Sequence, residues 1–374
     1  MACRTKTCLG FHLFLLAACY MQHFVSGSSP KVRCLFIFGD SFSDSGNNNY
    51  IPTTAKANYS PYGIDFPKGP TGRDNNGKTE IDIIGERLGL KKFIPPFANI
   101  LGSNILQGVN YASASAGIRN ETGKRTAGTN IAYGQQIENH KTIVAQIAAK
   151  LGSVKNAKKY LKKCLYYIYI GTNDYALNYF QPNLYPTSRM YNPKEYAKVL
   201  IDQYSVYGKV LYNLGARKFV AVGLGKIGCT PMVLANSSVN GPCVEELNDI
   251  EAIFSHKLRS LVDKISTKYP DSKTIFRNTT AIILDGSRGF TVLNASCCPM
   301  KKSNGFCIPD STPCPNRSEY VYFDGIHPTE AANKYTASLS YDSTNNPKIT
   351  YPMDIKHLAH LRIKISKNYI CVRK

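Results

Sequence analysis

Short apolar runs alternate with long amphipathic segments along most of this chain, and this alternation constrains the fold more than any other feature. The runs predicted as strands are Cys34–Phe38, Val109–Ala112, Cys164–Ile170, Arg217–Val222 and Lys273–Arg277. The segments predicted as helices are Thr79–Leu88, Ile131–Leu151, Asn192–Gly215, Val244–Ile265 and Thr329–Leu339. Strands that alternate with long helices indicate a parallel sheet with helices on both faces. We therefore expect an α/β fold, a three-layer α/β/α sandwich.

The N-terminal residues have the pattern of a secretory leader. Arg4 and Lys6 precede the apolar run Leu9–Tyr20, and small residues follow as far as Gly27. The run is too short for a membrane span, and no later apolar run is long enough for one. We expect a signal peptide at residues 1–27, a single domain at residues 28–374, and a secreted, extracellular protein without a transmembrane segment.

The chain is strongly basic, with a formal net charge of +21, of which +19 remains once Arg4 and Lys6 leave with the leader. The basic residues are scattered rather than gathered into one run, and the leader argues against a nucleic-acid partner. Two interpretations stay open: association with an anionic cell wall or lipid surface, or a generally basic and soluble exterior.

The first predicted strand ends at a serine. Cys34–Phe38 breaks at Gly39 into a polar turn that carries Asp40, Ser41 and Asp44. A serine at the end of a buried strand lies where open α/β sheets bind their ligands, although such a turn is common without any function. The two acids resemble a carboxylate pair of glycosidase type, but we expect them to accept hydrogen bonds from the turn's backbone.

An Asp-x-x-His turn stands near the other end of the chain. An apolar and aromatic run leads into Asp324, and His327 follows just before Pro328. A serine nucleophile needs a base, and that base needs a carboxylate to fix its tautomer. One loop can supply both. Taken singly, however, Asp324 is equally well explained as a turn residue and His327 as a surface histidine.

These residues carry a resemblance to a known family. Gly39-Asp40-Ser41 with the following Asp44–Asn48 resembles the first block of the GDSL esterase/lipase family of the SGNH hydrolase superfamily, and Asp324–Glu330 resembles its last block. Gly108–Ser113 is similar to the second block and Gly171–Tyr175 to the third. Lesser segments resemble the secreted plant branch, so the resemblance covers nearly the whole mature chain.

The resemblance implies an SGNH-hydrolase, flavodoxin-like sheet and a carboxylic ester hydrolase without metal or cofactor. Ser41 is then the nucleophile, His327 the base and Asp324 its partner. The oxyanion donors are the backbone N–H of Ser41, the side-chain amide of Asn173, and a main-chain N–H of the second block. That last position aligns with Ser115, where glycines are common in the family, and Gly117 is the alternative. Phe42 occupies the position of the leucine in the family's GDSL motif. Both residues are apolar, and this position takes no part in the chemistry.

An ordinary α/β-hydrolase shares the three-layer architecture but carries its serine in a Gly-x-Ser-x-Gly elbow. No such pentapeptide occurs here; Ser113–Gly117 lacks the first glycine. The close spacing of Asp324 and His327 also differs from that fold.

Nine cysteines follow the leader, and a secreted chain is expected to pair some of them. Cys229 and Cys243 flank a loop that they could close. Cys297, Cys298, Cys307 and Cys314 crowd a loop before the Asp-His turn, where bridges would brace it. Zinc is the competing interpretation of this cluster, but no histidine lies within it at ligand spacing. The odd count leaves at least one thiol free or paired between chains.

Six sequons predict exposed, glycosylated loops, at Asn58, Asn120, Asn236, Asn278, Asn294 and Asn316. Tyr166, Tyr167 and Tyr169 are expected to pack in the core and sheet. We expect four histidines outside the candidate site to be solvated, namely His140, His256, His357 and His360.

We therefore expect a secreted serine esterase or lipase that cleaves acyl esters through an acyl-enzyme. Two alternatives stay open. The acyl group could pass to an alcohol, which would make the protein an acyltransferase in cutin-like polymer assembly. The chain could instead be an inactive, basic, wall-binding glycoprotein, although the triad residues and Asn173 are all present.

Overall fold

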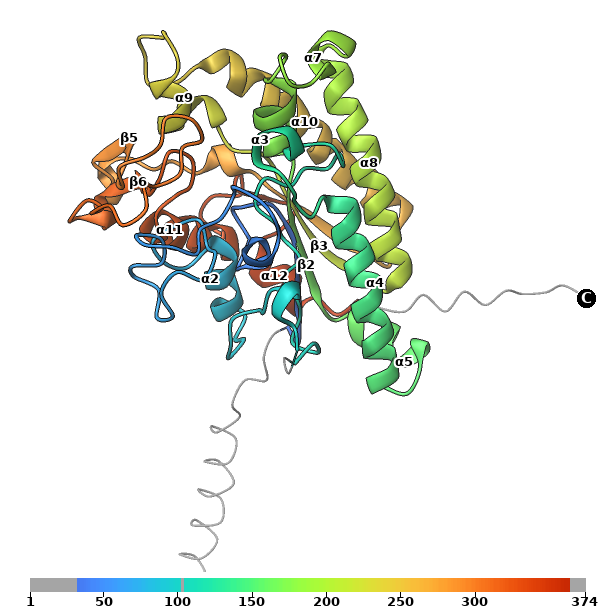
Figure 1. Ribbon diagram of the computed structural model, residues 1–374. Coiled ribbons are helices and arrows are strands. Elements are labelled where there is room, and N and C mark those ends of the chain that lie inside the picture. Colours follow the sequence, from blue (N-terminus) through green and yellow to red (C-terminus); the bar gives the residue numbers. More distant parts are fainter. Residues whose placement is uncertain (1–31, 102–103, 364–374) are drawn as a thin grey trace, which may run out of the picture. The chain divides into compact units, whose positions relative to one another are not determined.

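The computed structural model describes residues 32–101 and 104–363 (Figure 1). The predicted leader and Cys371 lie outside the described residues.

The main sheet of the described chain has five strands in the order β1-β2-β3-β4-β7. The strands are β1 (Leu35–Gly39), β2 (Leu165–Tyr169), β3 (Lys218–Val222), β4 (Lys273–Arg277) and β7 (Thr350–Tyr351). Strands β1 to β4 are parallel and β7 is antiparallel to β4. The carboxyl ends of four strands therefore meet at one edge, as the sequence predicted. A separate two-stranded sheet pairs β5 (Val292–Ser296) with β6 (Tyr320–Tyr322).

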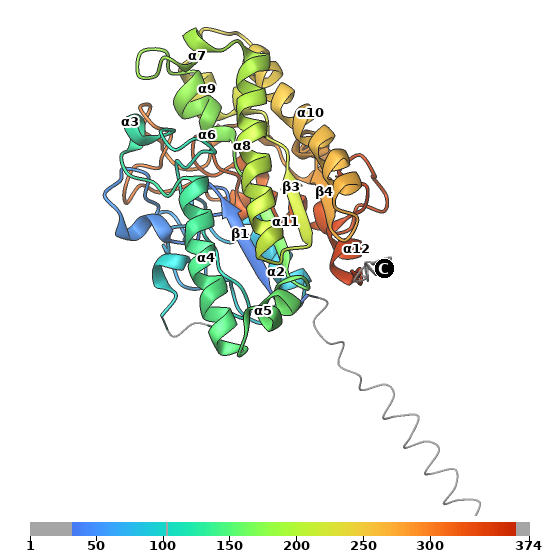
Figure 2. The same cartoon turned by 90° about the vertical axis from the view of Figure 1, so that its right-hand side faces the viewer.

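Helices cover both faces of the main sheet (Figures 1 and 2). On one face lie α4 (Tyr133–Lys150), α8 (Pro193–Leu214) and α10 (Glu245–Lys268). On the other lie α2 (Glu80–Arg87), α11 (Glu330–Tyr341) and α12 (Ile355–His360). The shorter helices are α3 (Lys124–Ala127), α5 (Val154–Leu161), α6 (Thr172–Asp174), α7 (Thr187–Met190) and α9 (Pro231–Ala235).

Several short helical turns complete the connections. The 3-10 turns are η1 (Asn47–Tyr50), η2 (Phe97–Asn99), η4 (Ile227–Cys229), η5 (Thr279–Ala281), η6 (Gly286–Arg288) and η7 (Arg317–Glu319), and η3 (Tyr175–Tyr179) is a π-helical turn.

Side-chain alternation explains why the central strands are apolar throughout. Successive residues of a strand point to opposite faces, so Ile168 of β2 faces α8 and α10 while Tyr167 and Tyr169 face the α2 and α11 side. Every residue of β1, β2 and β3 is buried. The three tyrosines of β2 thus pack in the core, as predicted.

Side-chain caps fix two of the predicted helix starts. The Asn192 side chain accepts from the backbone of Lys194 and Glu195, and the Glu195 carboxylate accepts from Asn192 N–H, which completes a capping box before α8. Gly215 follows the last residue of this helix with φ of 122°. Thr79 and Asp82 form the equivalent box at α2.

A buried ion pair ties helix α2 to strand β4. Arg277 places Nη2 at 2.8 and 3.0 Å from the two Glu80 carboxylate oxygens, and its Nε donates to Ser340 of α11 at 3.0 Å. A buried charge is costly unless it is paired, so these residues fix the layer beneath the carboxyl edge of the sheet.

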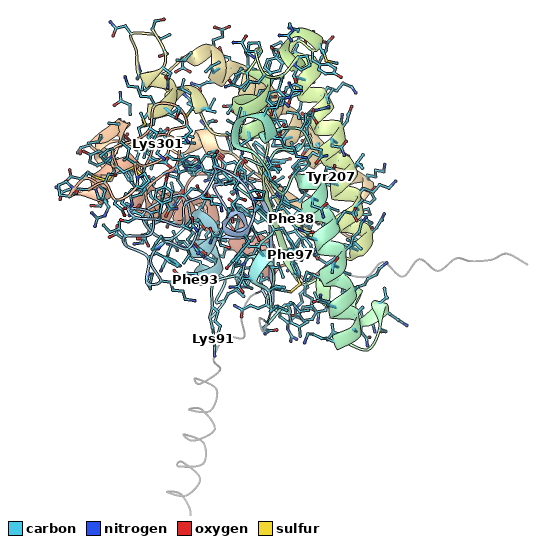
Figure 3. The ribbon with its side chains drawn as sticks, viewed as in Figure 1. Phe38, Lys91, Phe93, Phe97, Tyr207 and Lys301 are labelled. Atoms are coloured by element: carbon cyan, nitrogen blue, oxygen red, sulfur yellow. A yellow bond between two sulfur atoms is a disulfide. The ribbon has the colours of Figure 1, made fainter. Side chains whose placement is uncertain are left out.

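Aromatic side chains fill the interior on the α4 side. The Phe38 and Tyr111 rings stack with centroids 4.9 Å apart, and Phe97 approaches Tyr111 at 5.8 Å (Figure 3). Tyr207 of α8 reaches Tyr133 of α4 at 4.9 Å, which joins the two helices.

Two expectations, about one strand and one histidine, were wrong. Val109–Ala112 forms no regular strand; it runs beside β1 with isolated bridges, and Ile37 N–H donates to Val109 while Tyr111 N–H donates to Ile37. The Asn110 side chain accepts the Ala112 N–H at 2.9 Å, and such a local bond competes with a strand ladder. His140 is fully buried rather than solvated.

The burial of His140 has a plain cause. Its Nδ1 lies 3.0 Å from the Tyr111 hydroxyl, and its ring packs edge-on against Phe36. Burial lowers the pKa of His140 to about 3, so the ring is a neutral core residue. His256, His357 and His360 are exposed as expected.

Four disulfides link eight of the cysteines. They join Cys34 to Cys164, Cys229 to Cys243, Cys297 to Cys314 and Cys298 to Cys307. The predicted closure of the Cys229–Cys243 loop and the bridges in the four-cysteine loop are confirmed; the bond between the starts of β1 and β2 was not foreseen. Such bonds suit an oxidising compartment.

Five of the six sequon asparagines are exposed and Asn278 is partly buried. Asn294 lies within strand β5 rather than in a loop, which corrects one part of the expectation. Within residues 32–101 and 104–363, no helix has the length and apolar character needed to cross a membrane.

Candidate active site

Ser41 lies just beyond β1, and the last residue of this strand is fixed by contacts with α4 and β2. The Gln136 side chain of α4 accepts the Gly39 N–H at 3.0 Å and donates to the Gly39 carbonyl at 2.8 Å. A Cβ at Gly39 would stand 2.6 Å from the Tyr169 carbonyl of β2, so only glycine allows this approach. Ser41 is 7% exposed.

The two acids beside Ser41 shape the turn, as predicted. Asp40 accepts the Phe42 N–H at 3.2 Å, and Asp44 accepts the N–H groups of Gly46 and Asn47 at 2.8 Å each. Asp44 also accepts the Ala114 N–H at 3.1 Å, which joins this turn to the second block. Burial raises the pKa of Asp40 to about 7 and that of Asp44 to about 6.

Asp324 organises the turn that carries His327. One carboxylate oxygen accepts the backbone N–H groups of Ile326 and His327 at 2.8 and 2.7 Å, so the side chain closes its own turn. The other oxygen lies 2.9 Å from His327 Nδ1.

The two distant turns meet in a linear arrangement. His327 Nε2 lies 2.8 Å from Ser41 Oγ, while Nδ1 faces the Asp324 carboxylate. Asp324 is 0% and His327 2% exposed. Burial opposes the charged imidazole, but the charges of Asp324, Asp74 and Asp40 outweigh it and raise the pKa of His327 to about 9.

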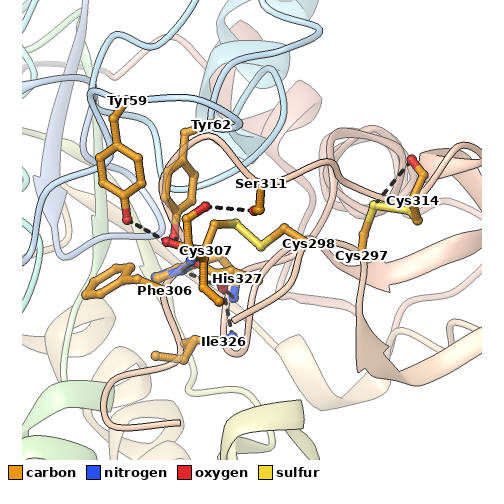
Figure 4. Close-up of a disulfide and its surroundings, with 12 residues drawn as sticks. Tyr59, Tyr62, Cys297, Cys298, Phe306, Cys307, Ser311, Cys314, Ile326 and His327 are labelled. Atoms are coloured by element: carbon orange, nitrogen blue, oxygen red, sulfur yellow. Dashed lines mark hydrogen bonds and ion pairs between the residues drawn. A yellow bond between two sulfur atoms is a disulfide. The ribbon is translucent and has the colours of Figure 1, made fainter. Parts of the chain in front are cut away.

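Tyr62 is a further contact of this carboxylate that the sequence did not point to. Its hydroxyl donates to Asp324 Oδ2 at 2.7 Å and accepts the Cys307 N–H at 3.0 Å. Figure 4 shows Tyr62 beside His327 and the Cys298–Cys307 disulfide. The tyrosine thus links the acidic residue of the site to the braced loop. No motif spacing marks a residue so far from Asp324 in the sequence.

Asp74 is a second group that sequence reasoning missed. It is 2% exposed, and neither carboxylate oxygen has a hydrogen-bond partner among the described residues. Burial, with nearby Asp44, Asp324 and Asp40, raises the pKa of Asp74 well above its usual range, and His327 only partly offsets this.

Asn173 follows β2, beside the edge where Ser41 follows β1. Its amide donates to the Ala116 carbonyl at 3.0 Å, which leaves the second N–H of the same amide for another acceptor. The neighbouring Asp174 accepts the N–H groups of Ile118 and Arg119 at 2.7 and 3.1 Å. These contacts hold the third block against residues 116–119, which follow the second block.

Ser115 has an unusual backbone for a residue with a side chain. Its φ is 64°, in the left-handed region that favours glycine, and its carbonyl accepts from the Asn130 amide at 3.0 Å. Gly117, the alternative donor, is tightly packed: a Cβ there would stand 2.5 Å from Thr122 and 2.7 Å from Asp174.

The geometry therefore places a hydroxyl, an imidazole and a carboxylate in hydrogen-bond series, with amide groups of two further loops at the same edge of the sheet. Such a series can activate the hydroxyl for attack on a carbonyl carbon. The four cysteines beside the site are all disulfide-bonded, so they do not offer the free thiolates that a zinc site uses.

Comparison with known proteins gives a consistent answer. The family model for GDSL-like lipase/acylhydrolase matches residues 35–339. GDSL esterase/lipase At1g29670 of Arabidopsis thaliana is 45% identical over 96% of this chain and 99% of its own length. At4g18970 of the same plant is 45% identical over 93% and 98%, and At1g71691 is 41% identical over 88% and 86%. The chain therefore belongs to the GDSL-like lipase/acylhydrolase family and is a carboxylic ester hydrolase.

Proposed function

We propose that this hydrolase works through an acyl-enzyme on Ser41, with His327 as general base and acid and Asp324 as the group that orients it. The single observation that carries the proposal is the 2.8 Å contact between His327 Nε2 and Ser41 Oγ, with Asp324 on the opposite ring nitrogen.

The reaction divides into two balanced halves. Ser41 Oγ attacks the ester carbonyl carbon while His327 Nε2 takes its proton; the tetrahedral intermediate then expels the alcohol, which leaves with that proton. Water gives a proton to His327 and attacks the acyl-enzyme. Collapse releases the carboxylic acid and returns the proton to Ser41 Oγ.

The oxyanion is held by N–H donors aimed at it before the reaction. We assign this role to the backbone N–H of Ser41, the Asn173 amide and the backbone N–H of Ser115, with Gly117 as the alternative to Ser115. Loss of one such donor typically costs about 2.7–4 kcal/mol of transition-state stabilisation. Asn173→Ala is then expected to lower kcat about 10²- to 10³-fold.

The acyl group of the substrate occupies a neighbouring cavity of about 150 Å³. Its lining includes Phe42, Thr172 and Ile326, the sequence neighbours of Ser41, Asn173 and His327. It runs over the carboxyl ends of β3 and β4, and the Glu80–Arg277 pair lines it as well. A cavity of about 150 Å³ in another protein accommodates benzene, so we expect acyl chains of about six carbons to fit best.

A series of p-nitrophenyl esters from two to twelve acyl carbons tests this cavity. Gly225 lines it, and a Cβ there would meet only ordinary contacts at 3.6 Å and beyond. Gly225→Val is therefore expected to shift the optimum toward shorter chains. Gly286→Ala is the control, because a Cβ there meets no atom within 4 Å and lies outside the cavity lining. An unchanged profile in Gly225→Val would place the acyl group elsewhere.

A serine-reactive phosphonate tests the nucleophile. Turnover and labelling are both expected to disappear in Ser41→Ala. Labelling of the parent protein without hydrolysis, together with ester formation when an acceptor alcohol is added, would favour the acyltransferase. Retention of both in Ser41→Ala would contradict the proposal.

We also propose that the protein is secreted and glycosylated, and that its surplus of +19 after leader removal favours anionic surfaces. The N-terminal sequence of the mature protein is expected to begin near residue 28, and glycosidase treatment is expected to lower its mass. Retention on an anionic polysaccharide should fall as salt is raised. Retention that ignores salt would argue against a charge-based association.

A further inference from the structure

Three tyrosine hydroxyl groups open into the cavity of about 150 Å³ that we assign to the acyl group. Its lining includes Tyr167 and Tyr169 of β2 and Tyr322 of β6. None of these hydroxyls forms a hydrogen bond with another residue of the described chain. All three nevertheless keep accessible surface, unlike the buried and unpaired hydroxyl of Tyr166 on the opposite face of β2. Because Tyr167 is 1% and Tyr169 5% exposed, the surface that their hydroxyls keep faces the cavity that they line.

The other side-chain groups of the lining are engaged, buried or solvated. Glu80 and Arg277 are paired with each other. Lys226 is exposed, so water can solvate its ammonium group. The Thr172 hydroxyl is buried without accessible surface, and three further threonine hydroxyls donate to backbone carbonyls, those of Thr230, Thr279 and Thr336. The hydroxyl donors of the described lining that a bound acyl group can reach are therefore those of the three tyrosines.

These three phenols stay protonated at neutral pH. Burial is the main cause that raises the pKa of each, that of Tyr322 to about 12, and the nearby charges of Glu80 and Asp40 add to it at Tyr167 and Tyr169. A neutral phenol can both donate and accept a hydrogen bond. Because Glu80 and Arg277 offset each other's charge, this part of the cavity favours a neutral polar group over a carboxylate.

An acyl chain that ends in a methyl group would cover the tyrosine hydroxyls without pairing them, which is unfavourable. A site that can pair a substrate hydroxyl discriminates against the analogue that lacks it. We propose that Tyr167 and Tyr169, together with Tyr322, select ester substrates whose short acyl group ends in a hydroxyl. This selectivity rests on the proposed acyl-enzyme, because the same cavity receives the acyl group.

Two p-nitrophenyl esters with the same number of non-hydrogen atoms test the selectivity. The 6-hydroxyhexanoate and the heptanoate differ only in the hydroxyl or methyl group at the chain end, and the cavity volume favours about six carbons. In the parent protein, kcat/KM should be about two- to tenfold higher for the hydroxy ester, the ratio expected for one net hydrogen bond. Ser41→Ala supplies the blank for hydrolysis and cyclisation without catalysis.

Tyr167→Phe combined with Tyr169→Phe should remove this preference from both sides. kcat/KM for the hydroxy ester should fall, whereas that for the heptanoate should rise, because its chain end no longer covers unpaired hydroxyls. Tyr322→Phe should lower the ratio as well. Tyr166→Phe is the matched control, since it removes a hydroxyl from the same strand on the opposite face, and it should keep the parent ratio. Equal losses for both esters in the double variant would assign its hydroxyls a merely structural role.

Other results would also overturn the proposal. Equal kcat/KM for the two esters in the parent, with both activities lost in Ser41→Ala, would refute the selectivity and leave the acyl-enzyme intact. A preference for p-nitrophenyl hydrogen adipate over both esters would place a carboxylate near Lys226 and refute the choice of a neutral hydroxyl. Absence of hydrolysis, or hydrolysis that survives Ser41→Ala, would refute the selectivity together with the function on which it rests.

Discussion

Tyr62 connects the carboxylate of the candidate triad to a disulfide-braced loop. Asp324 accepts from Tyr62, from two backbone groups and from His327, so its position is determined from several sides. We regard Tyr62 as a positioning residue, because it touches the carboxylate and acts on the reaction only through it.

Removing this hydroxyl should slow catalysis without weakening substrate binding. A hydrogen bond to a charged group contributes about 1.5–3 kcal/mol, so Tyr62→Phe is expected to lower kcat about 10- to 100-fold with KM nearly unchanged. Tyr59→Phe is the matched control, since Tyr59 donates to the Cys307 carbonyl at 2.9 Å and forms no hydrogen bond with Asp324. Equal losses in the two variants, measured by steady-state kinetics, would assign Tyr62 a merely structural role.

Asp74 should set the pH at which the enzyme becomes active. His327 acts as a base only when it is neutral, so kcat/KM rises with pH through its pKa. Asp74 is among the groups that raise this pKa to about 9. Asp74→Asn is therefore expected to lower the pKa of His327 and to move the acidic limb of the pH profile of kcat/KM to lower pH.

The control for this shift is Asp65→Asn, which removes a carboxylate bound to Arg317 and absent from the groups that act on His327. An unmoved limb in an active Asp74→Asn enzyme would mean that Asp74 carries no charge while His327 titrates.

At the residue scale, sequence could predict the groups that belong to contiguous motifs. Ser41, Asp324, His327 and Asn173 each stand in a short, recognisable block. Tyr62, Asp74 and Gln136 act through side chains that reach across the fold, and their role depends on distances that no spacing encodes. His140 was misjudged because its helix position alone does not reveal Tyr111 and Phe36 beside it.

Among the elements, the loop around Ser115 holds a residue with a strained backbone beside the candidate active site. A left-handed conformation costs about 1–2 kcal/mol for a residue with a Cβ. Ser115→Gly is therefore expected to leave the free energy of unfolding unchanged or raise it by up to about 1 kcal/mol, since glycine offsets part of the gain by its flexibility.

The same variant separates backbone from side-chain chemistry. Glycine keeps the N–H of residue 115, so kcat/KM should stay within about twofold of the parent. A large loss of activity with intact stability, measured by denaturant unfolding beside ester hydrolysis, would assign the role to the Ser115 hydroxyl instead.

Elements with strong local signals were predictable and those set by partners were not. Helix α8 has a capping box at its start and Gly215 at its end, and β1 to β4 lie in largely apolar runs. Val109–Ala112 is similarly apolar, yet the Asn110 side chain takes up backbone groups that a strand would use. Strand β7 has two residues and is paired with β4, so it is too short for its residue pattern to predict a strand.

At the scale of the whole molecule, we expect two disulfides to differ in their main effect. Cys34–Cys164 should contribute mainly to stability, and Cys298–Cys307 mainly to catalysis. In the chain-entropy treatment, a bond that spans 130 residues, as Cys34–Cys164 does, contributes about 5 kcal/mol, and one that spans 9 residues about 2.5 kcal/mol. Replacing the first pair by alanine should cost more stability in a denaturant titration. Replacing Cys298 and Cys307 should cost less stability but more kcat, because Cys307 supports Tyr62. The reverse order would contradict this division.

The sequence predicted the three-layer architecture because periodicity and strand alternation are repeated along the chain. It could not predict the partner of Cys34, since pairing among many cysteines depends on the finished sheet. The cavity over the carboxyl ends of β3 and β4 also depends on how α2 and α11 pack against the sheet, which no single segment specifies.

Ser41 and His327, the proposed nucleophile and its base, are separated by 286 residues. At a translation rate of about 5–20 residues per second, about 15–60 s pass at the ribosome between the synthesis of Ser41 and that of His327. Until then the nascent chain holds a serine with no imidazole to activate it. The order of synthesis thus leaves the proposed triad incomplete until nearly the whole chain has been made.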